Sequence, residues 1–251
     1  MDIKKGECAL GEKPDSDGSC LKPQHKKAVA MWAKVRDYTL AKKELGCTND
    51  GCVLDKMGVK GDDIKQEVLK PSGPANTMDL ISNFNISDIF KQFESKFPEF
   101  HGYPFQYHDF INHSDSEPIQ DPPSPDKPKK VYGMVVNTDV TGGPGIHWFA
   151  LMVDMRKRPW TVEYFNSSGN KPQAPISKWM AEIKDKLCSD GPCEVVLTND
   201  RFQHQKGNTE CGLYSMYYIW SRLNNVPYAN FGNGERIPDA KMTEFRKQLF
   251  S

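Results

Sequence analysis

The chain has 251 residues, enough for one large domain with an appendage and for an apolar core that needs no disulfide bonds. Its 33 lysines and arginines balance 33 aspartates and glutamates, so the composition disfavours binding to nucleic acid or to an anionic membrane. The longest purely apolar run, WFALMV at residues 148–153, is too short to cross a membrane, and the N-terminus lacks a secretory signal, so we expect a soluble, unsecreted protein.

The seven cysteines are an odd number, so at least one has no partner within the chain. In an unsecreted protein most should be reduced thiols. Two pairs share a C-x4-C spacing and could, with two N-terminal cysteines, be imagined as a zinc site, but structural zinc pairs more often have two intervening residues. We expect free surface thiols, no metal and no other cofactor. The cysteines concerned are Cys8, Cys20, Cys47, Cys52, Cys188 and Cys193.

The first part of the chain predicts a small helical segment. Residues 22–45 are rich in Lys, Ala, Leu and Glu, with apolar residues on one helical stripe, and Gly46 ends the pattern. A second helical piece covers residues 61–69, before the breaker run KPSGP at 70–74. This run separates the helical segment from everything after it.

The next stretch predicts one helix and then a loop. Residues 87–96 have the pattern of an amphipathic helix, with Phe90 and Phe93 on its apolar side. Residues 112–130 carry five prolines and few apolar groups, so we expect a long exposed loop there.

The remainder of the chain predicts strands, a helix, a strand and a helix. The run at 147–155 does not alternate apolar with polar residues, which is typical of a strand buried on both faces. This order indicates an α+β fold with a central mixed or antiparallel sheet flanked by helices. The predicted elements are strands at 130–139, 147–155 and 160–165, a helix at 175–187, a strand at 194–199 and a helix at 211–223.

The second and third of these strands should form a hairpin that brings two polar residues together. If the turn is centred between Arg156 and Lys157, His147 lies opposite Asn166, with the two Cβ atoms about 4.5–5.5 Å apart. The period of two puts these residues at the open end of an apolar face. The residues expected on that face are Phe149, Leu151 and Val153 on one strand and Trp160, Val162 and Tyr164 on the other.

A histidine held by an amide oxygen is fixed in tautomer and can take a proton from a thiol with its other nitrogen. Cys211 is the candidate thiol. Asn208 or Thr209 can cap the following helix, which would place Cys211 in its first turn, where the helix dipole and a nearby imidazolium favour thiolate. The expected result is a nucleophile that is activated before substrate arrives.

Acyl transfer also needs a donor for the oxyanion. The Cys211 backbone N–H and a side-chain amide from Gln203 or Gln205 would serve, and the residues alone do not choose between the two glutamines. Each candidate has a simpler structural interpretation by itself, because a cysteine among aromatics is commonly a buried hydrophobe and Asn166 lies in a turn-like segment. Only the whole set favours catalysis.

Several separated motifs resemble those of known cysteine peptidases. HW at the start of a buried strand, YFNS at the end of the next, and QKGNTECG around Cys211 resemble the clan of the ubiquitin-like-protein (SUMO) proteases and the adenovirus protease. VDMRKRPWTVEYFNSSGN, TECGLYSMYYI, GCTNDGCV and LISNFNI are similar to the polyprotein-processing cysteine proteases of African swine fever virus and related large DNA viruses. The resemblance extends from about Gly46 to the C-terminus.

This resemblance implies an adenain-type fold with a triad of His147, Asn166 and Cys211. It selects Gln205 as the oxyanion donor and implies that Trp148 roofs a substrate channel too narrow for side chains. It also implies a helical arm at residues 1–73 and a protease core at residues 74–251. Cellular members of the clan usually have Asp where this chain has Asn166, so the chain follows the viral branch.

The implied activity is cleavage of viral structural polyproteins after Gly-Gly during virion maturation. The expected location is the host cytoplasm, with packaging into the virion as a second location, and the expected partners are polyprotein substrates rather than nucleic acid or membrane. Two alternatives remain open: an isopeptidase acting on ubiquitin or SUMO conjugates, and a non-catalytic scaffold associated with the capsid. The sequence leaves the oligomeric state undetermined.

Overall fold

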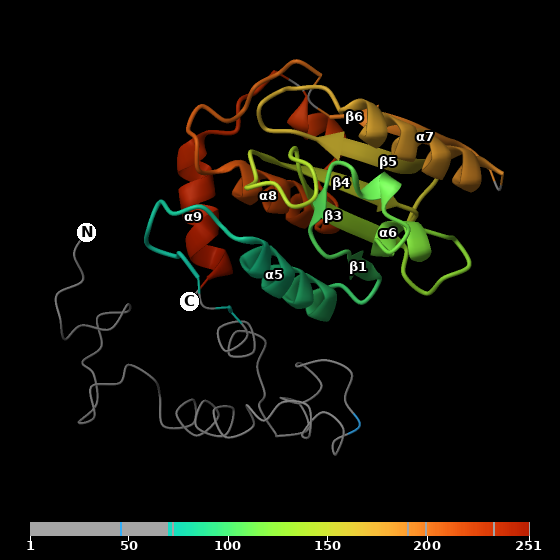
Figure 1. Cartoon of the computed structure of the whole chain (residues 1–251), viewed down its shortest axis with the longest axis horizontal. Coiled ribbons are helices and arrows are strands. Elements are labelled where there is room, and N and C mark those ends of the chain that lie inside the picture. The colour runs from blue at the N-terminus through green and yellow to red at the C-terminus, as the bar shows by residue number, and fades with distance from the viewer. Residues whose placement is uncertain are drawn as a thin grey trace. The chain divides into compact units, whose positions relative to one another are not determined.

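The computed structural model (Figure 1) describes Gly46 and residues 70–71, 73–189, 191–198, 200–232 and 234–250. The helices predicted at 22–45 and 61–69 lie outside these residues, as do Cys8, Cys20, Cys47 and Cys52. All elements described below belong to the second of two units into which the chain divides, residues 70–251. The helical arm at residues 1–73 therefore stays a prediction.

A mixed sheet of six strands forms the centre of this unit. Its middle is antiparallel and consists of β3 (Val131–Asn137), β4 (Trp148–Asp154) and β5 (Trp160–Phe165). On one side β1 (Phe100–Gly102) and β2 (Gln106–Tyr107) pair with β3 in parallel, and on the other β6 (Cys193–Leu197) pairs with β5 in parallel. The α+β class and the central hairpin are thereby confirmed.

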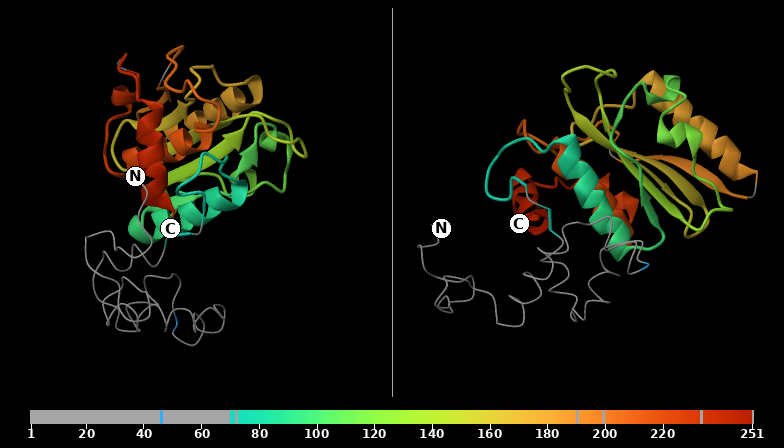
Figure 2. Two further views of the ribbon diagram at one scale, coloured as in Figure 1. Left: turned by 90° about the vertical axis from the view of Figure 1, so that its left-hand side faces the viewer. Right: turned by 60° about the horizontal axis from the view of Figure 1, so that its bottom comes forward.

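Helices cover both faces of the sheet, as Figures 1 and 2 show. The side chains of β3, β4 and β5 are almost all buried, and they alternate between two apolar clusters, one on each face. One cluster joins the sheet to α5 (Asn83–Lys96), α8 (Cys211–Leu223) and α9 (Asp239–Leu249). The other joins it to α7 (Ala174–Cys188) and the 3-10 turn η1 (Phe110–Asn112). Two short elements complete the description, α6 (Glu117–Gln120) and the 3-10 turn η2 (Tyr228–Phe231).

Some elements differ from the sequence prediction. Helix α5 begins before residue 87 because Ser82 and Asn85 form a reciprocal capping box ahead of it. The stretch at 112–130 is not wholly an exposed loop, because it contains α6 and buries Pro118. The strands β1 and β2 are too short to give a pattern. Helix α9 differs from the prediction because it is mostly polar, with Met242, Phe245 and Leu249 as its buried apolar residues.

The predicted register of the central hairpin is wrong by two residues. The strands pair Ala150 with Phe165 and Asp154 with Thr161, whereas the sequence placed Asp154 opposite Pro159. Proline has no N–H to give to a strand ladder, so the paired segment of β5 starts after it. A shift of two keeps every side chain on its face. The apolar face predicted around Phe149 and Tyr164 is therefore confirmed.

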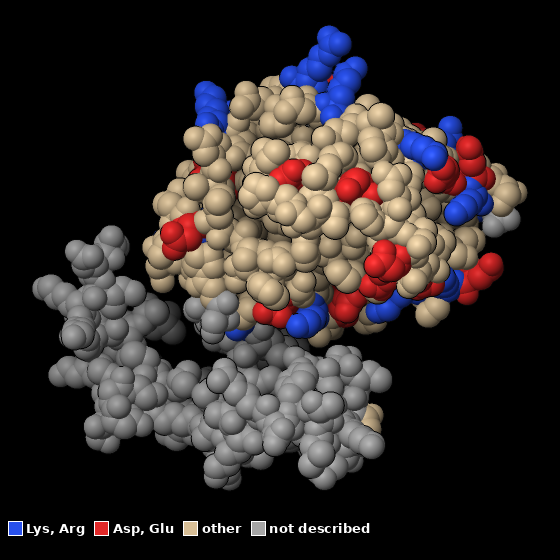
Figure 3. Space-filling view, viewed as in Figure 1, with Lys and Arg blue, Asp and Glu red and all other residues tan. Residues whose placement is uncertain are grey.

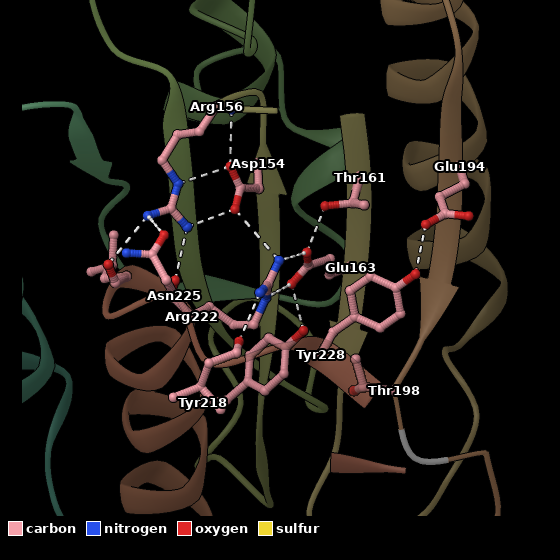
Figure 4. Close-up of polar contacts among 12 residues, drawn as sticks. Asp154, Arg156, Thr161, Glu163, Glu194, Thr198, Tyr218, Arg222, Asn225 and Tyr228 are labelled. Carbon is pink, nitrogen blue, oxygen red and sulfur yellow. Dashed lines mark hydrogen bonds and ion pairs between the residues drawn. The ribbon is translucent and has the colours of Figure 1, made fainter. Parts of the chain in front are cut away.

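A buried ionic network joins the two central strands to the C-terminal end of α8 (Figure 4). Glu163 on β5 is fully buried and accepts two hydrogen bonds from the Arg222 guanidinium, at 2.9 and 2.7 Å. The Tyr218 hydroxyl donates to the same carboxylate at 2.5 Å. Asp154 on β4 pairs with Arg156, whose guanidinium also donates to the backbone carbonyl of Arg222 at 2.8 Å. The network therefore satisfies two buried carboxylates and also caps the helix.

Replacing Arg222 with methionine should destabilise the protein strongly, because Glu163 would keep its charge in the core without its partner. The expected loss is about 3–5 kcal/mol in the free energy of unfolding. The matched control is Lys178→Met, which removes an exposed pair with Glu182 and should cost about 0.2–1 kcal/mol. Urea unfolding followed by tryptophan fluorescence measures both, and equal losses would contradict the role given to Arg222.

The prediction of free thiols is wrong for one pair of cysteines. A disulfide joins Cys188, the last residue of α7, to Cys193, the first residue of β6. The short turn between the helix and the strand brings the two Cα atoms to 5.5 Å, a separation that a disulfide can bridge. The C-x4-C spacing thus marks a covalent link between a helix and an edge strand.

In the view of Figure 3, the described part of the chain carries both acidic and basic side chains, with uncharged surface between them. Within the described ranges, no helix combines the length and the apolar character needed to cross a membrane.

Candidate active site

The hydrogen bond between His147 and Asn166 is the core of the site. His147 directly precedes β4 and Asn166 directly follows β5, and because these strands are antiparallel both residues reach the same edge of the sheet. The distance from His147 Nε2 to Asn166 Oδ1 is 2.7 Å. An amide oxygen can only accept, so the ring carries its proton on Nε2. Nδ1 is then the basic nitrogen of the neutral imidazole.

The Asn166 carboxamide is held in one orientation. Its oxygen also accepts from the backbone N–H and the hydroxyl of Ser168, at 3.0 and 2.8 Å. Its Nδ2 donates at 3.0 Å to the hydroxyl of Tyr164, which in turn donates to the carbonyl of Asn170 at 3.0 Å. Because the phenol gives its only proton to Asn170, it can only accept from Asn166. The direction of these bonds fixes the tautomer of His147.

Cys211 is the first residue of α8 and is 5% exposed. Burial raises the pKa of its thiol above the ordinary value, while hydrogen bonding to the backbone N–H groups of Trp148 and Gly212 acts in the opposite direction. Trp148 is the residue after His147, so the sulfur lies beside the segment that carries the imidazole. Burial also lowers the pKa of His147, and the hydrogen bond to Asn166 opposes this only in part.

These shifts correct one expectation. The sequence predicted a thiolate formed before substrate arrives, but burial of both groups favours the neutral thiol and the neutral imidazole in the free protein. The predicted cap is also wrong, because Glu210 occupies the N-cap position without a side-chain hydrogen bond to the helix. The Thr209 hydroxyl donates to the Glu210 carboxylate at 2.6 Å instead, and the carboxylate raises the Cys211 pKa further.

The two candidate glutamines differ in their surroundings. Gln203 is exposed, whereas Gln205 is buried and bonded at both ends of its carboxamide. Its Oε1 accepts from the Ser167 hydroxyl at 2.8 Å, and its Nε2 donates to the Gly207 carbonyl at 2.8 Å. The Gln205 side chain is therefore attached to the turn that follows Asn166, and its backbone N–H also donates to the Ser167 carbonyl at 3.0 Å.

Trp148 lies over the first turn of α8. Its ring meets Phe105 edge-to-face with 6.1 Å between ring centroids, and it is half-buried. A Cβ at Gly212 would lie 3.5 Å from the Trp148 ring and 2.5 Å from the Ile81 side chain. Gly212 therefore packs closely against the Ile81 side chain, which would have to move to admit a Cβ. Sequence reasoning missed Ile81, Tyr164 and Ser167. Their positions within LISNFNI and YFNS were the only available signal.

No group of three or more His, Cys, Asp or Glu side chains is placed to hold a metal ion within the ranges that the structure describes.

Comparisons with known proteins identify the family of this chain. Residues 73–251 match the family described as Ulp1 protease family, C-terminal catalytic domain. The chain therefore belongs to the Ulp1 protease family of cysteine proteases.

Within that family the chain is a thiol protease similar to a viral enzyme. It is 36% identical to "Cysteine protease S273R" of African swine fever virus, over 97% of this chain and 94% of the relative. A crystal structure of the protease from that virus superposes with a TM-score of 0.64 at 32% identity, covering 100% of this chain and 97% of that one. A putative thiol protease of Acanthamoeba polyphaga mimivirus is 24% identical over 82% of this chain and 69% of the relative.

Alkylation should reveal the protonation state of Cys211. Because burial raises the thiol pKa, the rate of reaction with iodoacetamide should climb with pH and have its inflection above about 8.5, the ordinary thiol value. Mass spectrometry of the peptide containing Cys211 measures this rate, with glutathione as the reference thiol. A rate that has already reached its plateau below pH 7 would instead indicate a preformed thiolate.

Proposed function

We propose that His147, Asn166 and Cys211 form the catalytic triad of this cysteine protease. The observation that carries the proposal is the 2.7 Å bond from His147 Nε2 to Asn166 Oδ1, together with the Cys211 thiol at the start of α8 beside Trp148. This bond leaves Nδ1 as the base, which is the role that a Cys–His pair requires.

The proposed reaction begins when His147 Nδ1 takes the thiol proton and the sulfur attacks the substrate carbonyl carbon. The backbone N–H of Cys211 and the side-chain amide of Gln205 stabilise the resulting oxyanion. His147 then gives its proton to the leaving amine as the C–N bond breaks. In the second half His147 deprotonates a water that attacks the thioester, the C–S bond breaks, and the thiol regains its proton.

The neutral resting pair fits this scheme. Asn166 carries no charge, so it supports an imidazolium less than an aspartate would, and burial raises the pKa of the thiol, which fits proton transfer during the attack on the carbonyl. The Asn166 carboxamide acts by orienting the imidazole. Its oxygen accepts the Nε2 proton, so Nδ1 stays unprotonated and can accept the thiol proton.

The proposed substrates are viral structural polyproteins cut after Gly-Gly. The resemblance to proteases in which the aromatic residue next to the catalytic histidine roofs a narrow channel supports this, because Trp148 follows His147 and its backbone N–H contacts the Cys211 thiol. The resemblance to the viral proteases supports the polyprotein, and with it the host cytoplasm and the virion as the expected locations.

A second candidate activity is an isopeptidase acting on ubiquitin-like conjugates. Relatives named "SUMO-1 cysteine protease", 36% identical to this chain, favour it. A SUMO or ubiquitin probe with an electrophile after its Gly-Gly terminus distinguishes the two, since an isopeptidase should be labelled at Cys211 far faster by the folded probe than by a Gly-Gly peptide of the same warhead.

Cleavage of a polyprotein fragment containing Gly-Gly-Xaa tests the main proposal. The protein should produce two discrete products, and Cys211→Ala should reduce kcat by several orders of magnitude because no other group can form the acyl-enzyme. The matched control is the same fragment with Ala-Ala in place of Gly-Gly, which should be cut far more slowly. An intact Gly-Gly fragment, or equal cutting by Cys211→Ala, would refute the proposal.

The role of Trp148 can be tested by selectivity. Trp148→Ala should slow cleavage of the Gly-Gly fragment and raise the relative rate for the Ala-Ala fragment, because the wider channel would accept a Cβ. Trp220→Ala is the control, since Trp220 is another half-buried tryptophan, packed on Phe93 and Phe97 near the other end of α8. The ratio of kcat/KM for the two fragments should change only in the Trp148 variant. An unchanged ratio in that variant would refute the proposal that Trp148 roofs the substrate channel.

A further inference from the structure

Ser167 lies between the proposed triad residue Asn166 and Ser168, which hydrogen-bonds to Asn166. Ser167 itself contacts His204 and Gln205 instead. It is 1% exposed. Its backbone carbonyl accepts from the backbone N–H groups of His204 and Gln205, at 2.9 and 3.0 Å. Its hydroxyl donates to Gln205 Oε1 at 2.8 Å. Three hydrogen bonds therefore fasten the segment of the proposed oxyanion donor to the turn that carries Asn166.

The direction of these bonds determines how the Gln205 carboxamide is turned. The Gly207 carbonyl can only accept, so the end of the carboxamide that it meets at 2.8 Å must be the Nε2 amide. The opposite end is then the oxygen, and the Ser167 hydroxyl spends its one proton there. The amide has a second N–H besides the one given to Gly207, and this second N–H is the donor that an oxyanion needs.

Loss of the Ser167 hydroxyl would remove one of the two constraints on that orientation. Gln205 is 5% exposed, so its Oε1 would be left buried without this donor. The carboxamide would then gain by rotating toward another donor, and rotation moves the second N–H away from the reacting carbonyl. The backbone bonds from Ser167 would persist, so the loop itself should stay in place.

We propose that Ser167 is a positioning residue that orients the Gln205 amide toward the oxyanion. The inference rests on the proposed function, in which Gln205 is an oxyanion donor. Ser167 thereby couples the two halves of the site: its main chain continues the turn from Asn166, and its side chain sets the amide that faces the developing negative charge. It touches neither the thiol nor the imidazole in this scheme.

The first test separates kcat from KM with the Gly-Gly fragment. Ser167→Ala should lower kcat about tenfold or more and leave KM nearly unchanged. The reason is that a misoriented Gln205 amide weakens a hydrogen bond made only to the oxyanion of the transition state. Gln205→Ala should lower kcat by about 10²–10³-fold. Ser167→Thr keeps the hydroxyl and should restore most of the rate, whereas Ser167→Cys, with a weaker S–H donor, should be intermediate. The matched control is Ser221→Ala, another buried serine near the far end of α8, which should retain the rate of the parent protein.

The second test is a double-mutant cycle. If Ser167 acts through Gln205, adding Ser167→Ala to Gln205→Ala should change kcat by less than about twofold. An equal loss of kcat in both backgrounds, or a Ser167→Ala protein with unchanged kcat, would overturn the inference while leaving the proposed function intact. Gln205→Ala with the kcat of the parent protein would instead refute the oxyanion role of Gln205 and the inference with it. If Ser167→Ala fails to fold, the cycle is carried out with Ser167→Cys.

Discussion

The antiparallel pairing of β4 with β5 is the constraint on which the rest of the site depends. Because the two strands run in opposite directions, the residue before one and the residue after the other reach the same edge of the sheet. His147 and Asn166 occupy those positions and meet at 2.7 Å. Both strands are buried on both faces, so their register is fixed by apolar packing on each side. A site at the ends of these strands is held rigidly by the apolar core, while its own polar side chains lie outside that core.

The position of Cys211 depends on a second anchor at the opposite end of α8. There Arg222 and Tyr218 converge on Glu163, and Arg156 binds the last carbonyls of the helix and Asp154 at once. The same two strands that carry the histidine and asparagine at one end thus hold the C-terminal end of the helix that presents Cys211. One sheet positions all three residues of the proposed triad. The cost is a pair of buried carboxylates, which stay tolerable only while every partner is present.

The polar part of the site works through the direction of its hydrogen bonds. Tyr164 gives its proton to Asn170 and so can only accept from Asn166, which must then turn its oxygen to His147. The Gly207 carbonyl likewise compels Gln205 to present its oxygen to Ser167. A group that can only accept, such as a backbone carbonyl, determines the orientation of a group that can both donate and accept, such as a carboxamide. Burial makes these assignments strict, because a wrong orientation would leave a buried polar group unpaired.

The sequence by itself predicted the α+β class, the central hairpin and a contact between His147 and Asn166, although the observed register does not place these two residues directly opposite each other. The contact was predictable because an error of two residues in the register leaves each side chain on the same face of the sheet. Cys211 at the start of a helix was also predictable, since a polar, glycine-containing lead-in precedes an apolar helical pattern.

Only the tertiary structure gives the burial of the Cys211 thiol and the His147 imidazole, the different surroundings of the two glutamines, and the links made by Ser167 and Cys188. Sequence rules for a helix start predicted a capped, thiolate-bearing N-terminus, but burial of Cys211 raises its pKa and Glu210 takes the cap position. Desolvation depends on everything that packs around a group, including Trp148 and Ile81 from distant parts of the chain. Local patterns record which residues are available for chemistry, whereas burial and the direction of hydrogen bonds arise only when the chain has folded.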